Sequence, residues 1–212
     1  TKMIVAAELI RQKEYPKYGK EPISIGFWVG GGVTPNKFKE LEEDPEDPAK
    51  TRAARSKKNS IYKQLLRCPF CGKPLTEENF YINIPTKSVS VYCSDDKCIF
   101  YRYKPGNKMR IPVYLVDEEI YAKCPTIILS TVDKFAGLPW DVNTNALFGR
   151  VDRLCSRDGY VAIGADHPRH NRTAELPTST ITPIKPFLPP ELIIQDELHL
   201  ITGPLGTVYG AY

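Results

Sequence analysis

Two closely spaced pairs of cysteines constrain the fold of this chain more than any other feature of its sequence. Cys68 and Cys71 are separated by two residues, in Cys-Pro-Phe-Cys-Gly, and Cys93 and Cys98 are separated by four residues. Two residues between thiolates let both sulfurs reach one metal ion, and backbone N–H groups of the tight turn stabilise the sulfur charge. The spacing therefore predicts a structural zinc (Zn²⁺) ribbon with these four cysteines as ligands, because four thiolates leave no open position for a substrate water.

The remaining cysteines and a pair of histidines form weaker patterns. The six cysteines could form a disulfide framework in a secreted protein, but the close pairing of four of them favours a metal. Cys124 and Cys155 are predicted to be unpaired, inert thiols. His167 and His170 have a spacing that could bind a metal, with Cys155 as a further ligand, but a chance histidine pair in a loop is the favoured interpretation.

Length and charge limit the class of protein. A chain of 212 residues with 42% hydrophobic content can bury one sizeable core plus a small module that needs its own staple. Lys and Arg outnumber Asp and Glu by 29 to 25, which permits a nucleic-acid partner without indicating one. No apolar run approaches the roughly 18 to 20 residues that cross a bilayer, and no signal peptide is recognisable, so we expect a cytoplasmic protein with no membrane partner.

The apolar pattern of the first 48 residues predicts the start of an α/β domain. Apolar residues at helical spacing over 4–10 indicate a helix, and the apolar run at 23–29, which ends in three glycines, indicates a buried strand. Thr34 is a good N-cap and Pro35 fits the first helical position, so we expect a helix at about 35–43.

An inserted module is predicted after the acidic, proline-rich stretch at 42–48. A basic helical segment at 49–67 leads into the cysteine pairs, and short alternating runs at 80–84 and 89–92 indicate strands between them. The chain is therefore divided into the start of the main domain, the inserted basic helix with its zinc ribbon, and the continuation of the main domain, at 1–48, 49–104 and 105–212.

The main domain is expected to continue with strands at 111–116 and 126–130 and a short helix from about Val132. Residues 140–190 are rich in Pro, Thr, Arg and Asn and show little periodicity. They are predicted to be loops with a few short strands, such as the run at 160–163.

Two acids follow the last apolar run of the chain. Residues 192–194 predict a short buried strand that delivers Asp196 and Glu197 at its C-terminal end, where open α/β sheets place their ligands. Carboxylates in such a crevice need a metal, a cation or water to offset their desolvation, and Mg²⁺ with a nucleotide phosphate meets that need. The alternative is a helix with acids in its first turn, favoured only by the helix dipole.

Three blocks of sequence resemble a known family. The blocks are 26–36, 125–136 and 194–207. In this order they resemble the DrmA-like helicases of the bacterial DISARM anti-phage systems, and Asp196-Glu197-Leu198-His199 resembles motif II of superfamily 2 helicases in its Asp-Glu-x-His form. The resemblance implies part of a RecA-like motor domain with a parallel sheet, ATP-driven action on DNA, and a place in phage defence beside other defence-system subunits.

The same resemblance implies roles for individual residues. Asp196 would hold Mg²⁺ through water, Glu197 would position and deprotonate the water that attacks ATP, and His199 would connect the ATP site to the nucleic-acid side. The strand-end loops called motifs Ia and Ib, which hold the phosphates of the tracked strand, would consist of Gly32, Thr34 and Pro35, and of Ser130, Thr131 and Lys134. From the residues alone, each of these two segments is equally well explained as an ordinary helix N-cap.

One required part of such a motor is absent from the sequence. No Gly-x-x-x-x-Gly-Lys-Ser/Thr phosphate loop occurs in the 212 residues. The resemblance therefore implies that the loop lies upstream of Thr1 and that the second motor domain lies downstream of Tyr212. We expect this chain by itself neither to hydrolyse ATP nor to unwind nucleic acid.

A rival interpretation belongs to another class of protein, a non-catalytic zinc-ribbon module that binds nucleic acid or a protein partner. The basic helix and an aromatic cluster around the second cysteine pair could grip a single strand by charge and stacking. Those side chains could equally form the module's own core. The cluster consists of Tyr92, Phe100, Tyr101, Arg102 and Tyr103. A metallohydrolase is disfavoured because no His-Glu-x-x-His or comparable open ligand set is present.

Overall fold

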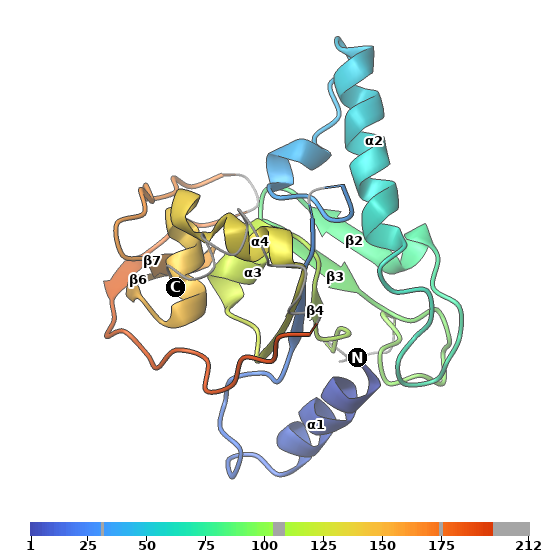
Figure 1. Cartoon of the computed structure of the whole chain (residues 1–212). Helices are drawn as coiled ribbons and strands as arrows, with labels where there is room; N and C mark the ends of the chain where they lie inside the picture. Colours follow the sequence, from blue (N-terminus) through green and yellow to red (C-terminus); the bar gives the residue numbers. More distant parts are fainter. Residues whose placement is uncertain (31, 104–108, 174–175, 197–212) are drawn as a thin grey trace. The chain divides into compact units, whose positions relative to one another are not determined.

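The computed structural model describes residues 1–30, 32–103, 109–173 and 176–196, which divide into two compact units (Figure 1). The first unit comprises Thr1–Ile120 and Pro125–Leu129. The second unit comprises Tyr121–Cys124 and the described residues from Ser130 onward. Each unit has its own cluster of buried apolar side chains.

A parallel sheet forms the centre of the first unit and gives the chain a mixed α/β fold. Its strands are β1 (Ile25–Trp28), β4 (Val113–Tyr114) and β5 (Ile127–Ser130), in the order β4-β1-β5. Ile25 of β1 is aligned with Val113 of β4 in parallel register. The sequence predictions of strands at 23–29, 111–116 and 126–130 are confirmed, although β4 is shorter than its apolar run.

Three α-helices lie in the described part of the first 123 residues, and the start of the second has a clear local cause. They are α1 (Lys2–Lys13), α2 (Pro48–Tyr62) and α3 (Asp117–Lys123). The side chain of Asp47 caps α2 by accepting hydrogen bonds from the backbone N–H groups of Ala49 and Lys50, and Pro48 occupies the first helical position. The predicted helices at the start of the chain and over the basic segment are therefore confirmed.

None of the described helices combines the length and apolar composition that a bilayer-spanning helix needs.

The predicted helix at 35–43 is wrong. This segment instead contains the short 3-10 helix η1 (Phe38–Leu41), whose N-cap is Lys37. The hydroxyl of Thr34 donates to the carbonyl oxygen of Val29 at 2.9 Å, so it fixes the turn after β1 and does not cap a helix. Phe38 and Leu41 are both buried, and their burial sets the path of the segment in place of local helix propensity.

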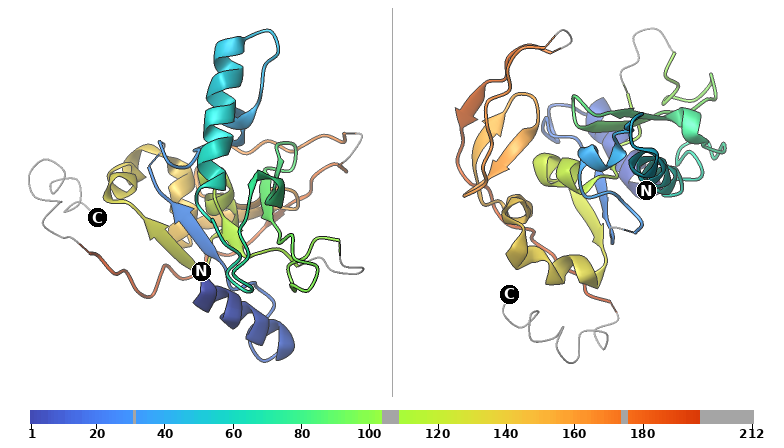
Figure 2. Two further views of the ribbon diagram at one scale, coloured as in Figure 1. Left: turned by 90° about the vertical axis from the view of Figure 1, so that its right-hand side faces the viewer. Right: turned by 90° about the horizontal axis from the view of Figure 1, so that it is seen from above.

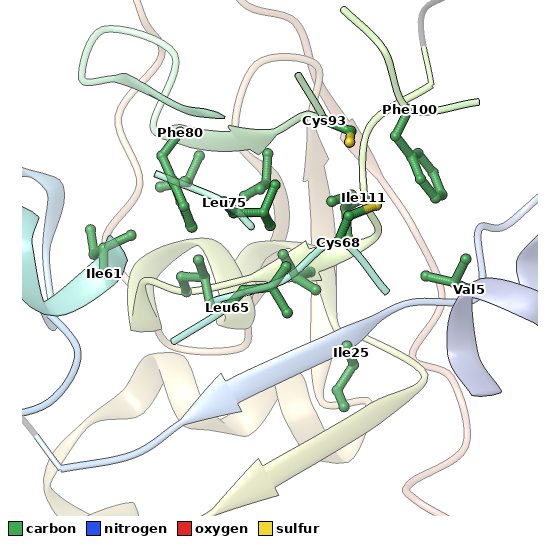
Figure 3. Packing of buried hydrophobic residues seen from close by; sticks show 14 of the residues in the cluster. Val5, Ile25, Ile61, Leu65, Cys68, Leu75, Phe80, Cys93, Phe100 and Ile111 are labelled. Carbon is green, nitrogen blue, oxygen red and sulfur yellow. The ribbon is translucent and has the colours of Figure 1, made fainter. Parts of the chain in front are cut away.

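The segment that contains the cysteine pairs shares the core of the first unit. It carries η2 (Glu77–Asn79) and the antiparallel strands β2 (Phe80–Asn83) and β3 (Ser88–Val91), which confirm the two predicted strands. Its buried side chains, including Leu65 and Phe80, belong to one cluster with Ile25 of β1 (Figure 3). The insertion boundaries at 49 and 104 remain a prediction, but the segment between them does not have a core of its own.

The described residues of the second unit contain short helices and three short strands, where the sequence predicted a short helix from about Val132 and loops with a few short strands. These elements begin with α4 (Val132–Ala136), η3 (Leu138–Trp140) and η4 (Val142–Phe148). An antiparallel sheet follows, in the order β7-β6-β8, and its strands lie side by side in Figure 2. The strands are β6 (Val151–Cys155), β7 (Gly159–Ala162) and β8 (Ile181–Pro183). Only β7 overlaps the run that the sequence singled out. β6 also pairs with β8 across a long connection, and such pairing leaves no periodic signal in the sequence.

The predicted buried strand at 192–194 is also wrong. These residues have no regular secondary structure, and their side chains are exposed, Ile194 at 83%. A run of three apolar residues becomes a strand only when a neighbouring strand pairs its backbone groups, and none of the described strands does so here. Asp196 is exposed at the end of the described part of the chain, and Glu197 and His199 lie outside the described residues.

Candidate metal centre

A tight turn after α2 holds the first cysteine pair. The backbone N–H of Cys68 donates to the carbonyl oxygen of Lys73 at 2.8 Å, and the N–H of Gly72 donates back to the carbonyl of Cys68 at 2.9 Å. Gly72 has a φ of +78°, which residues with a side chain rarely adopt, so glycine at this position allows the turn to close directly after Cys71.

A second turn, after β3, holds the other pair. The N–H of Cys93 donates to the carbonyl of Phe100, and the N–H of Cys98 donates to the carbonyl of Asp95, both at 2.9 Å. The N–H of Asp95 points at the sulfur of Cys93 at 3.4 Å. This local bonding accommodates the longer spacing of the second pair, and it supplies the N–H···S contact expected around a metal-bound thiolate.

The two turns bring all four sulfurs into one cluster. Every pair of sulfurs lies within 4.8 Å, with Cys68 Sγ and Cys98 Sγ 3.8 Å apart and Cys71 Sγ and Cys93 Sγ 3.5 Å apart. A tetrahedral zinc ion with Zn–S bonds of about 2.3 Å requires sulfurs about 3.8 Å apart. The structure thus brings the four predicted ligands together in an arrangement that fits a structural zinc ion.

Burial of this cluster favours the neutral thiols until a cation is present. Cys68, Cys93 and Cys98 are buried, whereas Cys71 lies at the surface. Burial raises the pKa of Cys93 to about 11 and also raises the pKa of Cys98. For Cys71 the raising effect of burial is outweighed by the N–H of Lys73 and the neighbouring thiols, so its pKa is lowered. A divalent metal would displace these protons and offset the cost of burying thiolates.

The aromatic cluster beside this site divides between core and surface. Phe100 is 1% exposed and meets Phe70 edge-on, with ring centroids 6.2 Å apart (Figure 3 shows Phe100 beside Cys68 and Cys93). Tyr103 is 71% exposed, and the guanidinium of Arg102 lies 3.4 Å from the ring centroid of Tyr81. Phe100 is therefore core, whereas Arg102 and Tyr103 have the exposure that a stacking surface requires.

The basic face of α2 is largely paired with acids of the preceding segment. Arg55 and Lys58 both form ion pairs with Glu43, at 3.0 and 2.8 Å. Lys57 pairs with Glu40 at 3.4 Å. These pairs reduce the positive charge that the helix presents to a nucleic acid, an effect that its sequence alone does not reveal.

The residues assigned to motifs Ia and Ib follow two neighbouring parallel strands. Gly32, Thr34 and Pro35 come after β1, and the last two are buried. Ser130 ends β5, its hydroxyl donates to the carbonyl of Thr131 at 3.0 Å, and Thr131 stands at the N-cap of α4 without a side-chain capping bond. Lys134 lies within α4.

A second group of metal-binding residues, which the sequence interpretation disfavoured, is brought together in the second unit. Cys155, His167 and His170 offer ligand atoms that all lie within 4.8 Å of one another. A second pattern in the sequence also indicates metal ligands at this place. Cys155-Ser-Arg-Asp158-Gly159 repeats the pattern of Cys68-Pro-Phe-Cys71-Gly72, with an acid in place of the second thiol.

The fold and the cysteine cluster together define the class of protein, a mixed α/β protein with a four-cysteine cluster that could hold a metal ion. No protein-family model matches the chain. The chain is 47% identical over 215 residues to DISARM protein DrmA of Bacillus paralicheniformis, in an alignment that covers 100% of this chain and 18% of that protein. The chain is thus homologous to a segment of that much longer protein, which confirms the resemblance to the DrmA-like family.

Proposed function

We propose that this chain is part of the first motor domain of an ATP-dependent superfamily 2 helicase or translocase that acts on DNA in anti-phage defence, beside other defence-system subunits. The observation that carries the proposal is the 47% identity to a DISARM DrmA protein along the whole chain. All three blocks of the family resemblance fall within that alignment, because it leaves no part of the chain uncovered.

The sheet of the first unit supports a RecA-like origin of the fold. In open α/β sheets, ligands bind beyond the carboxyl ends of parallel strands. Gly30, Val33 and Thr34 follow the carboxyl end of β1, and Thr131 with α4 follows the carboxyl end of its neighbour β5. Under this proposal each segment separately would approach phosphates of a tracked strand through its exposed groups, without readout of a base. The buried hydroxyl of Thr34 holds the first of these turns in place.

The proposed chemistry rests on the Asp-Glu-x-His box. Asp196 would hold Mg²⁺, Glu197 would act as the base for the water that attacks ATP, and His199 would link ATP hydrolysis to the nucleic acid. The phosphate loop and the arginine of the second motor domain would come from elsewhere in the full-length protein. The four cysteines would hold a structural zinc ion with no step in ATP hydrolysis.

The experiment that tests this function is nucleic-acid-stimulated ATP hydrolysis by the full-length protein, comparing wild type with Glu197→Gln. The substitution keeps the shape of the side chain but removes the base. We expect turnover to fall by about a hundredfold or more, with ATP binding retained, because general-base catalysis contributes 10²–10⁴-fold. Glu191→Gln is the matched control, since Glu191 is an exposed acid in the same segment that the family motif does not include.

Two results would overturn the motor assignment. One is undetectable ATP hydrolysis by the wild-type protein in the presence of DNA, and the other is equal turnover in wild type and Glu197→Gln. Either result would favour the rival function, a non-catalytic zinc-ribbon module. The stacking of Arg102 on Tyr81 beside exposed Tyr103 is the observation that supports that rival. Under it, Tyr103→Ala would weaken single-stranded DNA binding while ATP plays no part.

A further inference from the structure

The hairpin between β6 and β7 repeats the local plan of the first cysteine turn. In both places a cysteine is followed after two residues by a second metal-binding side chain and then by a glycine with positive φ, +78° at Gly72 and +122° at Gly159. We propose that Cys155, Asp158, His167 and His170 form a second, mixed-ligand zinc site. This site is independent of the four-cysteine cluster and of the motor function proposed above.

Three of these residues, Cys155 and the two histidines, already place their ligand atoms in one cluster, and Asp158 lies beside both histidines. Asp158 Oδ2 lies 3.0 Å from His170 Nε2 and 3.9 Å from His167 Nε2, and the ligand atoms of Cys155 and the two histidines lie within 4.8 Å of one another. Ligand atoms about 2.0–2.1 Å from a zinc ion are about 3.3 Å apart in a tetrahedron. Small side-chain adjustments would therefore place a metal between all four groups.

Cys155 and Asp158, the two candidate ligands in the β6–β7 hairpin, are positioned by contacts within the second unit. Cys155 is the last residue of β6, and its register with Gly159 of β7 fixes the turn between them. The ammonium of Lys123 donates to the backbone carbonyl of Asp158 at 2.7 Å. A Cβ at Gly159 would lie 2.2 Å from the carbonyl oxygen of Ala122, so only glycine permits this close approach.

Hydrogen bonds to Ser179, in the segment before β8, hold the part of the site that carries the histidines. The N–H of His170 donates to the hydroxyl of buried Ser179 at 2.8 Å, and the N–H of Ser179 donates back to the carbonyl of His170 at 2.9 Å. The side chain of Arg169 donates to the carbonyl of Ser179 at 2.9 Å. Both parts of the site are thus pre-positioned, as a metal site with specific geometry requires.

The chemistry of the donors selects zinc and a structural role. The Cys155 sulfur and the Asp158 carboxyl group are both buried, and as ligands they would supply negative charge to a divalent cation, while the two imidazoles complete the set. One sulfur, two imidazoles and one carboxylate suit zinc better than Mg²⁺ or Ca²⁺, which prefer oxygen ligands. Because four protein ligands leave no open position, the ion would fasten His167 and His170 to the β6–β7 hairpin and would not activate water.

The test measures bound zinc in the purified full-length protein by mass spectrometry of the metal, for wild type and single-site variants. Cys155→Ser and His170→Gln should each lose about one zinc ion per chain. Cys71→Ser should lose the ion of the four-cysteine cluster instead, so the double variant with both Cys155→Ser and Cys71→Ser should lose about two. Cys124→Ser is the matched control, since that thiol lies in the same unit, its sulfur donates to the backbone carbonyls of Tyr121 and Ala146, and it belongs to neither group of candidate ligands; its zinc content should equal that of wild type.

A variant-free measurement covers the case in which a substituted protein fails to fold. Wild-type protein loaded with cadmium-113 should give one NMR resonance for a four-thiolate site and a separate, more shielded one for a site with a single thiolate. A folded Cys155→Ser or His170→Gln variant with wild-type zinc content would overturn the proposal. So would the absence of a single-thiolate cadmium resonance, which would leave Asp158 and His170 as a hydrogen-bonded pair without metal.

Discussion

Glu8 of α1 is the most informative single residue for the stability of the first unit. Its side chain is 6% exposed and accepts four hydrogen bonds of 2.7 Å. Two come from the guanidinium of Arg11, one from Gln12, and one from the backbone N–H of Ile23, which lies two residues before β1. Arg11 in turn donates to the carbonyl of Gly19, so this carboxylate joins α1 to the loop that leads into the sheet.

Glu8→Gln should destabilise the chain strongly. The substitution leaves the buried Arg11 charge without its partner and turns an amide NH₂ toward N–H donors. Loss of one member of a buried ion pair costs about 3–5 kcal/mol. For a chain of this size, each kcal/mol shifts Tm by about 2–4 °C, so Tm should fall by roughly 6–20 °C.

The matched control is Glu14→Gln, which removes the exposed pair between Glu14 and Lys17 in the same region. Such surface pairs contribute about 0–1 kcal/mol, so this variant should unfold close to wild type. Thermal and urea unfolding, followed by circular dichroism, measure both variants. The reasoning is refuted if Glu8→Gln lowers the free energy of unfolding by no more than Glu14→Gln does.

The pH dependence supplies a second check on the same carboxylate. Burial by itself would raise the pKa of Glu8, but hydrogen bonds from Arg11, Gln12 and Ile23 outweigh it and lower the pKa below its ordinary value of 4.5. A lowered folded-state pKa stabilises the fold above the unfolded pKa, and that contribution is lost as pH falls through the folded pKa. The stability gap between wild type and Glu8→Gln should therefore narrow as pH falls below 4.5, and a constant gap would contradict the assignment.

Two further perturbations test other parts of the structure. Gly159→Ala forces a φ of +122° and a clash with the carbonyl of Ala122, so it should destabilise the second unit by about 2 kcal/mol or more, measured by thermal unfolding; Gly137→Ala, at a φ of −83°, is the control and should have a much smaller effect. Removal of zinc by a chelator, or by Cys98→Ser, should unfold the core around the four-cysteine cluster. Bound zinc contributes about 10–16 kcal/mol of folding free energy in zinc-finger peptides, which is similar to the whole free energy of unfolding of a typical protein. Circular dichroism during chelation and after zinc return measures this effect, and a folded, unchanged spectrum without metal would contradict it.

Much of the architecture could be predicted because its causes are local. The zinc turn depends on a short spacing and on one glycine, so Cys68, Cys71 and Gly72 predict it without knowledge of the rest of the chain. The strands β1, β5 and β3 coincide with apolar or alternating runs, and α2 begins at an Asp-Pro cap. In each case the signal lies within a few residues of the element that it specifies.

The tertiary structure decided the features that depend on partners distant in sequence. The turn after β1 is not a helix because Thr34 bonds to Val29 while Phe38 and Leu41 enter the core. Residues 192–194 are apolar, but without a paired neighbour among the described strands they form no strand. Cys155 and His170 become neighbours because β6 pairs with β8 across a long connection, which brings the segment before β8 to the β6–β7 hairpin, and spacing along a chain carries no information about such pairing.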